Sequence, residues 1–456
     1  MPLHLASNDD FSTVRKLLKS VGFLEQPIAE RLQAGPRESQ DAVGVLIDLF
    51  ARAQPIEATA AAALLGDKAQ AALQALGLIE TIGNSIKATC LLYPFEDLWI
   101  ASDFPGASRE DFVFPALSTQ SHQFHAILPD TPCDALLDIG AGAAAASLAA
   151  AKDYAATVCA SDISTRCVLF AEFNRRLNNV ANAEVIQSDV YEALDSRTFD
   201  RIIAHPPYIP TLGDGESYRH GGAHGEDILR RVLEGLSKHL RPGGRAYLST
   251  LACDHSDAPL EERLFEMLGP DSSDFRLLVA EWESLPSIEF VMRLVEVGEL
   301  DFDQGAQQVR SFREAGVTQL VRCAVVVARE SGDGSQVMRR VMGQGTGAAE
   351  LDAAFAASPA EIADLLEQRL VLSPWSTLES TSALSENRWR SFTRVLDCQH
   401  PFHFRTDCPE WAAEALAHLD GSLTLREALG QADVDPDDAE IFFECLVNAG
   451  ALTPTA

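Results

Sequence analysis

Four apolar runs in the middle of the chain alternate with segments of helical spacing, and each run ends near a polar residue. The runs cover residues 135–139, 157–162, 184–189 and 199–205. Short apolar runs separated by helices are typical of buried parallel strands. In an open α/β sheet, ligands bind outside the carboxyl ends of the strands. The pattern therefore predicts an α/β region with a site where these polar ends meet.

The last run ends abruptly in His205, Pro206, Pro207 and Tyr208. Proline has no N–H and a fixed φ, so the doublet cannot continue a strand ladder and forms a rigid bend. The bend leaves carbonyl oxygens that no strand uses. Tyr208 then offers a flat face for a planar group, and an amide or a nucleobase fits that description.

A glycine-containing turn, with Gly140 and Gly142, follows the first run, and a helix-prone segment comes next. Glycines let a ligand approach the backbone closely, although the third glycine of a dinucleotide fingerprint is replaced by alanine. Asp162 ends the second run about twenty residues later. A carboxylate there accepts hydrogen bonds from a ribose diol in doubly wound folds. The two features together predict a nucleotide-like cofactor.

These motifs resemble those of the class I S-adenosylmethionine-dependent methyltransferases. The resemblance covers roughly residues 110 to 330 and includes the turn Leu-Arg-Pro-Gly-Gly at 240–244 and the glycine-rich loop at 218–225. It is strongest to the small-domain subgroup with an (Asn/Asp)-Pro-Pro-(Tyr/Phe) motif. That subgroup includes glutamine N5-methyltransferases of release factors and ribosomal proteins, and amino-N-methyltransferases of nucleobases. The implied fold is a Rossmann-like, seven-stranded α/β sheet whose last two strands lie at its edge.

The resemblance also implies roles for individual residues. Those expected to bind S-adenosylmethionine are Asp138, Gly140 and Gly142 along the methionine part, Asp162 with Ile163 at the ribose, Ser188, Asp189 and Val190 at the adenine, and His205 beside the acceptor. The expected catalytic group, which holds the amino group to be methylated, is His205, Pro206, Pro207 and Tyr208. No metal is expected, because methyl transfer from a sulfonium is a direct displacement whose rate comes from alignment and electrostatics.

His205 stands where the family has Asn, Asp or Ser. A neutral imidazole accepts one hydrogen bond and an imidazolium accepts none. We therefore expect activity to fall as the pH drops through the histidine pKa, which is near 6.5 when unperturbed. A different acceptor atom, or a catalytically inactive scaffold that still binds the cofactor, is the alternative meaning of this residue.

Two further parts flank the catalytic region. Residues 1–108 contain helices and a hairpin around Gly83-Asn84, which is a helical or winged-helix-like pattern. The helix that would contact nucleic acid in such a pattern, Lys68–Leu76, carries a single lysine. Phosphate contacts need clustered basic residues, so a packing or substrate-recruiting role is favoured for this part. The methyltransferase-like region is expected to span 109–330 and a linker 331–348. Residues 349–456 are expected to form an acidic, winged-helix-like part, whose role could be dimerisation, peptide binding or packing against the core.

Charge and composition narrow the partners. The net charge is −31, whereas a protein that binds nucleic acid electrostatically is normally basic. A protein or peptide acceptor is therefore favoured, with the amino group of an RNA or DNA base as the alternative. No apolar run is long enough to span a membrane, and the N-terminal residues lack a basic region followed by an apolar stretch. Nine scattered cysteines form no Cys-x-x-Cys pair. These features predict a cytoplasmic protein with reduced thiols, and they leave the oligomeric state open.

Overall fold

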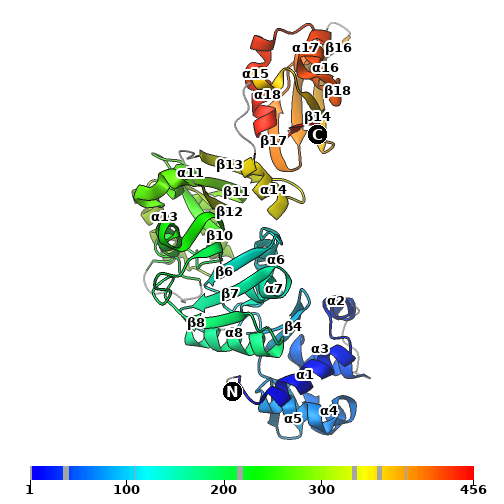
Figure 1. Ribbon diagram of the computed structural model, residues 1–456, viewed down its shortest axis with the longest axis vertical. Coiled ribbons are helices and arrows are strands. Elements are labelled where there is room, and N and C mark those ends of the chain that lie inside the picture. Colours follow the sequence, from blue (N-terminus) through cyan, green and yellow to red (C-terminus); the bar gives the residue numbers. More distant parts are fainter. Residues whose placement is uncertain are drawn as a thin grey trace.

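The computed structural model describes residues 3–33, 41–107, 109–212, 219–330, 336–356, 362–385 and 388–455. The chain forms an elongated molecule, with the α/β region between an N-terminal part at one end and a C-terminal part at the other (Figure 1). None of the described helices is long and apolar enough to cross a membrane.

Seven strands at the centre form the sheet that the sequence predicts. In spatial order they are β8 (Ala183–Gln187), β7 (Ala155–Asp162), β6 (Cys133–Ile139), β9 (Phe199–Ala204), β10 (Leu240–His255), β12 (Val317–Arg329) and β11 (Phe275–Pro286). The strands from β8 to β10 are parallel, and β12 runs antiparallel to both of its neighbours. The four apolar runs are thus confirmed as parallel strands of a Rossmann-like sheet. The strand order reverses between β6 and β9, which is where such folds bind ligands.

Helices cover both faces of this sheet. One face packs against α6 (Thr119–Ala126), α7 (Ala145–Asp153) and α8 (Thr165–Leu177), and the other against α9 (Asp227–Glu234), α10 (Leu236–His239) and α11 (Leu260–Glu266). Neighbours along β6 divide between the two faces, since Leu136 joins the first apolar cluster and Leu137 the second. Burial on both faces explains why these strands are continuously apolar rather than alternating.

The resemblance implied that the sheet ends at β11, but the sheet extends further. It continues through β13 (Gln336–Met342), β17 (Phe402–Asp407), β16 (Arg388–Cys398) and β15 (Ser376–Ser385) to eleven described strands. The guanidinium of Arg339, on β13, donates to Asp254 of β10 at 2.8 Å and to Glu281 of β11 at 2.8 Å. The linker expected over 331–348 is therefore wrong for residues 336–342; residues 331–335 lie outside the described part.

The N-terminal part contains the helices and hairpin that the sequence predicts. They are α1 (Asn8–Ser20), α2 (Glu25–Gln33), α3 (Ala42–Phe50), β1 (Ile56–Glu57), α4 (Ala58–Leu65), α5 (Asp67–Ala75), β2 (Ile79–Ile82) and β3 (Ser85–Ala88), followed by the hairpin of β4 (Leu91–Phe95) and β5 (Leu98–Ser102). Their apolar side chains share one cluster with α7 and α8. The assignment as a winged helix stays a prediction.

Two helices and a compact C-terminal cluster complete the fold. Between β11 and β12 the chain forms α12 (Ser287–Glu296) and α13 (Phe302–Glu314). The C-terminal elements are α14 (Ala348–Ala356), α15 (Ile362–Leu365), β14 (Arg369–Leu372), α16 (Glu410–Leu416), β18 (Asp420–Thr424), α17 (Leu425–Gln431), α18 (Pro436–Asn448) and β19 (Leu452–Pro454). The elements from α15 onward have an apolar core of their own.

Candidate active site

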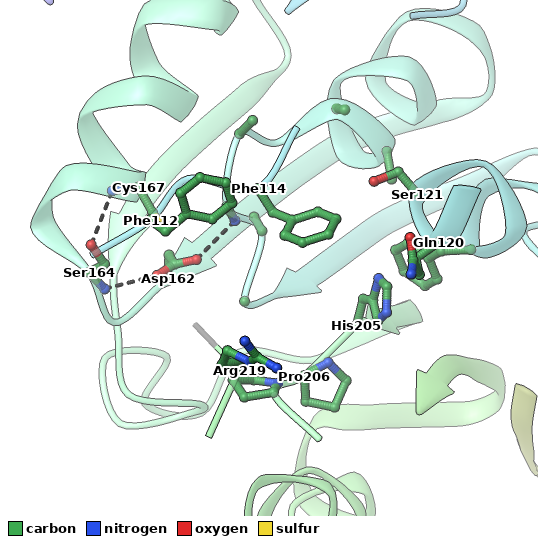
Figure 2. Close-up of a pocket in the computed structure, with 18 of the residues that line it drawn as sticks. Phe112, Phe114, Gln120, Ser121, Asp162, Ser164, Cys167, His205, Pro206 and Arg219 are labelled. Carbon is green, nitrogen blue, oxygen red and sulfur yellow. Dashed lines mark hydrogen bonds between the residues drawn. The ribbon is translucent and has the colours of Figure 1, made fainter. Parts of the chain in front are cut away.

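A cavity of about 440 Å³ lies at the carboxyl ends of β6, β7 and β9 (Figure 2). This is where the strand order reverses. The residues expected from the sequence that line it are Asp138, Gly140, Gly142, Asp162, Ile163, His205, Pro206, Pro207 and Tyr208. The glycine turn with Asp162 and the motif from His205 to Tyr208 therefore face the same cavity, which is large enough for a drug-sized ligand.

Asp162 holds the glycine turn that forms one wall of the cavity. Its carboxylate accepts the backbone N–H of Gly142 at 2.9 Å and that of Ser164 at 2.8 Å (Figure 2). Gly140 and Gly142 have φ of 71° and 55°, and a Cβ on either would point into open space. Glycine is required there by the left-handed backbone, and the open space is what a ligand could fill.

Asp138 lies at the base of this wall, and its side chain is buried. Burial raises the pKa of Asp138 to about 7, and the negative charge of Asp162 adds to this increase. A hydrogen bond from Ser147 lowers the pKa and offsets part of it. Burial also raises the pKa of Asp162, against the backbone hydrogen bonds that lower it. A buried and a half-buried carboxyl group beside each other favour a cationic ligand, because its charge would stabilise their ionised forms.

His205 forms the opposite wall, at the end of β9. Its ring stacks on that of Tyr208, with centroids 5.6 Å apart, and lies 5.3 Å from the ring of Phe124. Within the described residues, neither ring nitrogen of His205 makes a hydrogen bond to the protein. The imidazole is thus positioned between aromatic rings with its nitrogens free to bind a ligand.

The pKa of His205 is lowered to about 4, first by burial and then by the positive charge of Arg322. This shift moves the decline in activity that is expected at the histidine pKa from near 6.5 toward about 4. The Arg322 guanidinium donates to Oε1 of Gln123 at 2.5 Å and lies over the Trp282 ring, 5.6 Å from its centroid. These contacts fix the position of the Arg322 guanidinium near His205.

The glycine-rich loop packs directly on the proline motif. The backbone N–H of Ile209 donates to Arg219, and that of Gly221 donates back to Ile209. A Cβ on Gly221 would lie 2.8 Å from Cα of Tyr208, and one on Gly225 would lie 2.4 Å from the Tyr208 carbonyl oxygen. These glycines let the loop press against the motif. Residues 213–218, between these two segments, lie outside the described ranges.

Several lining residues were not identified from the sequence. They are Phe95, Asp111, Phe112, Phe114, Gln120, Ser121, Phe124, Ser164, Cys167, Arg219 and Glu299, with small residues between them. Phe112 and Phe114 come from an irregular segment before β6 and line the cavity (Figure 2). Asp103 fixes this segment, because it accepts the Val113 N–H at 2.8 Å and pairs with Arg166. The signal that could have found it is the Phe-Val-Phe-Pro sequence at 112–115.

The residues expected at the adenine do not line the cavity. Asp189 pairs with Arg231 at 2.9 Å and borders a separate shallow hollow together with Val190. The Ser188 hydroxyl is buried and bonds to Ala193 N–H and to the Val190 carbonyl. The structure therefore brings together the residues expected for the methionine, the ribose and the acceptor, and leaves out those expected for the adenine.

Comparison with known families agrees with this site. Residues 117–266, about a third of the chain, match the family described as "Methyltransferase small domain". The matched residues include β6, β7, β8, β9 and the glycine turn. The central region therefore resembles the methyltransferase small domain, and its strands form a Rossmann-like sheet.

Curated proteins similar to part of this chain are named as methyltransferases. A putative protein N5-glutamine methyltransferase of Methanocaldococcus jannaschii is 37% identical over 24% of this chain and 57% of its own. Release factor glutamine methyltransferases of Gloeobacter violaceus and Xylella fastidiosa are 29% and 32% identical, over 26% and 32% of this chain and 46% and 54% of theirs. The chain thus spans about half the length of the curated relatives it matches.

A solved ribosomal protein L11 methylase from Lactobacillus delbrueckii subsp. bulgaricus is 18% identical, over 44% of this chain and 71% of its own, with a TM-score of 0.27. A score that low does not establish a shared fold. The fold assignment comes from the strand order of this chain.

Proposed function

We propose that this protein transfers a methyl group from S-adenosylmethionine to the nitrogen of a planar amide or amine of a protein or peptide, and that a glutamine side-chain amide is the leading acceptor. One observation carries the proposal. The His205–Tyr208 motif and the Asp138–Asp162 wall line the same cavity. The names of the relatives support an amide nitrogen in a protein as the acceptor.

The cavity fits S-adenosylmethionine in charge and in shape. The glycine turn would lie along the methionine part, where a Cβ would meet open space. The buried carboxyl group of Asp138 would face its positive charge. The Asp162 carboxylate already accepts two backbone N–H groups, and its remaining lone pairs would accept the ribose hydroxyls. When bound, the cofactor supplies a sulfonium methyl group.

The acceptor wall suits a neutral amide. The His205 ring, neutral because its pKa is about 4, would accept one amide N–H, and the carbonyl of Pro206 would accept the other. Both hydrogen bonds would increase electron density on nitrogen and fix its direction of attack. The N–C bond forms as the S–C bond breaks. The proton that nitrogen loses would pass to His205, which releases it to water readily at neutral pH.

The overall charge favours a protein over a nucleic acid. At −31, the chain would repel a phosphate backbone unless it carried a local basic surface. Four arginines that lie at the cavity or on helices covering the central sheet are already paired with carboxylates, which reduces the positive charge they offer to a phosphate. They are Arg166, Arg219, Arg231 and Arg263.

Transfer of labelled methyl groups into an extract tests the proposal. The purified protein is incubated with S-adenosylmethionine labelled on the methyl group and an extract of the source cells. The products are then divided by protease and by nuclease treatment. We expect label that protease releases and that mass spectrometry places on a side-chain nitrogen. Label that only nuclease releases would identify a base amine as the acceptor. Calorimetric binding of S-adenosylmethionine without any transfer would identify an inactive scaffold.

A further inference from the structure

The hairpin of β15 and β16 forms an arm that extends beyond the rest of the large sheet. Strand β17 pairs only with residues 395–398 of β16, so the outer half of β16 pairs with β15 alone. All residues from 377 to 384 are exposed, on both faces of the strand. The arm belongs to the C-terminal part, near the labels β16 and β17 in Figure 1. Two strands without a covering layer are only marginally stable in water.

The outer edge of β15 has features that natural proteins usually avoid. Within the described part of the chain, no strand pairs with it on its second side. Ten residues long, it contains one charged residue, Glu379, and no proline. Leu378 and Leu384 are 45% and 61% exposed. A long, nearly uncharged edge strand with exposed apolar side chains is a template for a further strand.

We propose that β15 pairs antiparallel with β15 of a second copy of this chain, about a two-fold axis through Thr381. A two-fold axis normal to the sheet keeps each side chain on its own face. Paired residues must therefore lie on the same face, so they are separated along the strand by an even number of positions.

One register satisfies this condition and also matches the side chains. With Thr381 opposite Thr381 of the partner subunit, Leu378 lies opposite Leu384 in both symmetric positions, and Glu379 lies opposite Ala383. Directly opposed apolar side chains stabilise an antiparallel pair. Centring on residue 379 would place two glutamates opposite each other, and centring on residue 380 would place both leucines opposite serines.

The other free edge of the arm is poorly suited to self-pairing. The outer half of β16 carries Arg388 and Arg390 in its sequence. Like charges directly opposite each other destabilise a strand pair. On β15, by contrast, the Glu379 carboxylate is already paired with Arg405, on the face opposite to the leucines. Charge and side-chain match both select β15.

The expected dimer is of moderate strength. Pairing over residues 377–385 adds about nine backbone hydrogen bonds and buries four leucines, which is less than a standard protein interface of about 1,600 Å². We therefore expect reversible association in the micromolar range, with the two-fold axis at the C-terminal part.

Sedimentation velocity on the full chain between about 1 and 200 μM tests the proposal. We expect the sedimentation coefficient to rise from that of a monomer to that of a dimer. Leu378→Glu combined with Leu384→Glu places like charges opposite each other twice and should weaken association by at least tenfold. Leu378→Glu combined with Leu384→Lys places opposite charges in the same positions and should restore most of it.

Ile82→Glu is the matched control, because Ile82 is also an exposed aliphatic residue of a hairpin, at 58% exposure, in the N-terminal part. It should leave association unchanged. Circular dichroism confirms that each variant is folded. A wild-type protein that stays monomeric at 200 μM, or a dimer that survives the double glutamate substitution, would overturn the proposal. Equal dimerisation of the two charge-substituted pairs would exclude the register.

Discussion

The two walls of the cavity suppress charge in opposite ways. On the cofactor wall, burial raises the pKa of the carboxyl groups of Asp138 and Asp162, while backbone N–H groups bind Asp162. On the acceptor wall, burial and Arg322 lower the pKa of His205, and its neighbours are the aromatic rings of Phe124 and Tyr208. A bound cation would therefore favour the ionised carboxylates of Asp138 and Asp162. The His205 imidazole stays neutral and suits a neutral nucleophile.

The largest effect is expected on the cofactor wall. Asp162→Ala removes the acceptor of Gly142 N–H, of Ser164 N–H and of the ribose hydroxyls, so it should weaken S-adenosylmethionine binding by about 300-fold. Isothermal calorimetry measures this. Asp189→Ala is the matched control and should change the affinity less than about threefold, because Asp189 pairs with Arg231 outside the cavity. A larger loss from Asp189→Ala than from Asp162→Ala would contradict this placement of the cofactor.

Substitution on the acceptor wall should separate catalysis from cofactor binding. His205→Ala removes a hydrogen-bond acceptor that is needed in the transition state, so it should lower kcat by about 100-fold. Calorimetry should show cofactor affinity within about threefold of wild type. His205→Asn keeps an acceptor oxygen and should retain more activity than His205→Ala. Equal rates for the three proteins would show that His205 does not hold the acceptor.

Cofactor affinity should depend on pH through Asp138. Below its pKa of about 7, the free protein holds this carboxyl group protonated, and the cationic ligand must displace that proton. Binding of S-adenosylmethionine should therefore be about tenfold weaker at pH 6 than at pH 8. Asp138→Asn should abolish the difference. Calorimetry in buffers of different ionisation enthalpy would show up to one proton released on binding at pH 6, and no release would refute this assignment.

The smallest effect concerns the charge of Arg322. Wild-type kcat should stay flat as the pH falls and decline only toward the His205 pKa of about 4. Arg322→Gln removes the positive charge that opposes protonation, so the decline should begin about half a pH unit higher. Arg322→Lys keeps the charge and serves as the control. The pH–rate profile is measured with circular dichroism at each pH, and superimposable Gln and wild-type profiles would show that Arg322 has no such role.

The sequence predicts the parts of the fold and the site that depend on local pattern. The strands at 135–139 and 199–204 are apolar because they are buried on both faces, and the glycine turn requires a left-handed backbone at Gly140. Strand β13 was missed because glycine-rich stretches flank it and because its partner, β11, lies about sixty residues earlier. Phe114 lines the cavity from an irregular segment, and Arg322 acts on His205 from a distant strand, so spacing along the chain could not place either residue there. Burial, which neutralises His205, is equally invisible to sequence.

Strand β13 also has a consequence for how the chain is made. The ribosome releases β11 before β13, and β17 emerges only after another sixty residues. Until β13 emerges, the outer edge of β11 is bare, and Asp254 and Glu281 lack the guanidinium of Arg339. Until β17 emerges, β13 is itself the open edge of the sheet. Translation stalled in this stretch would leave a nascent chain whose methyltransferase region is complete in sequence but exposed along one side. The C-terminal part is thus the last segment to cover the open edge of the sheet.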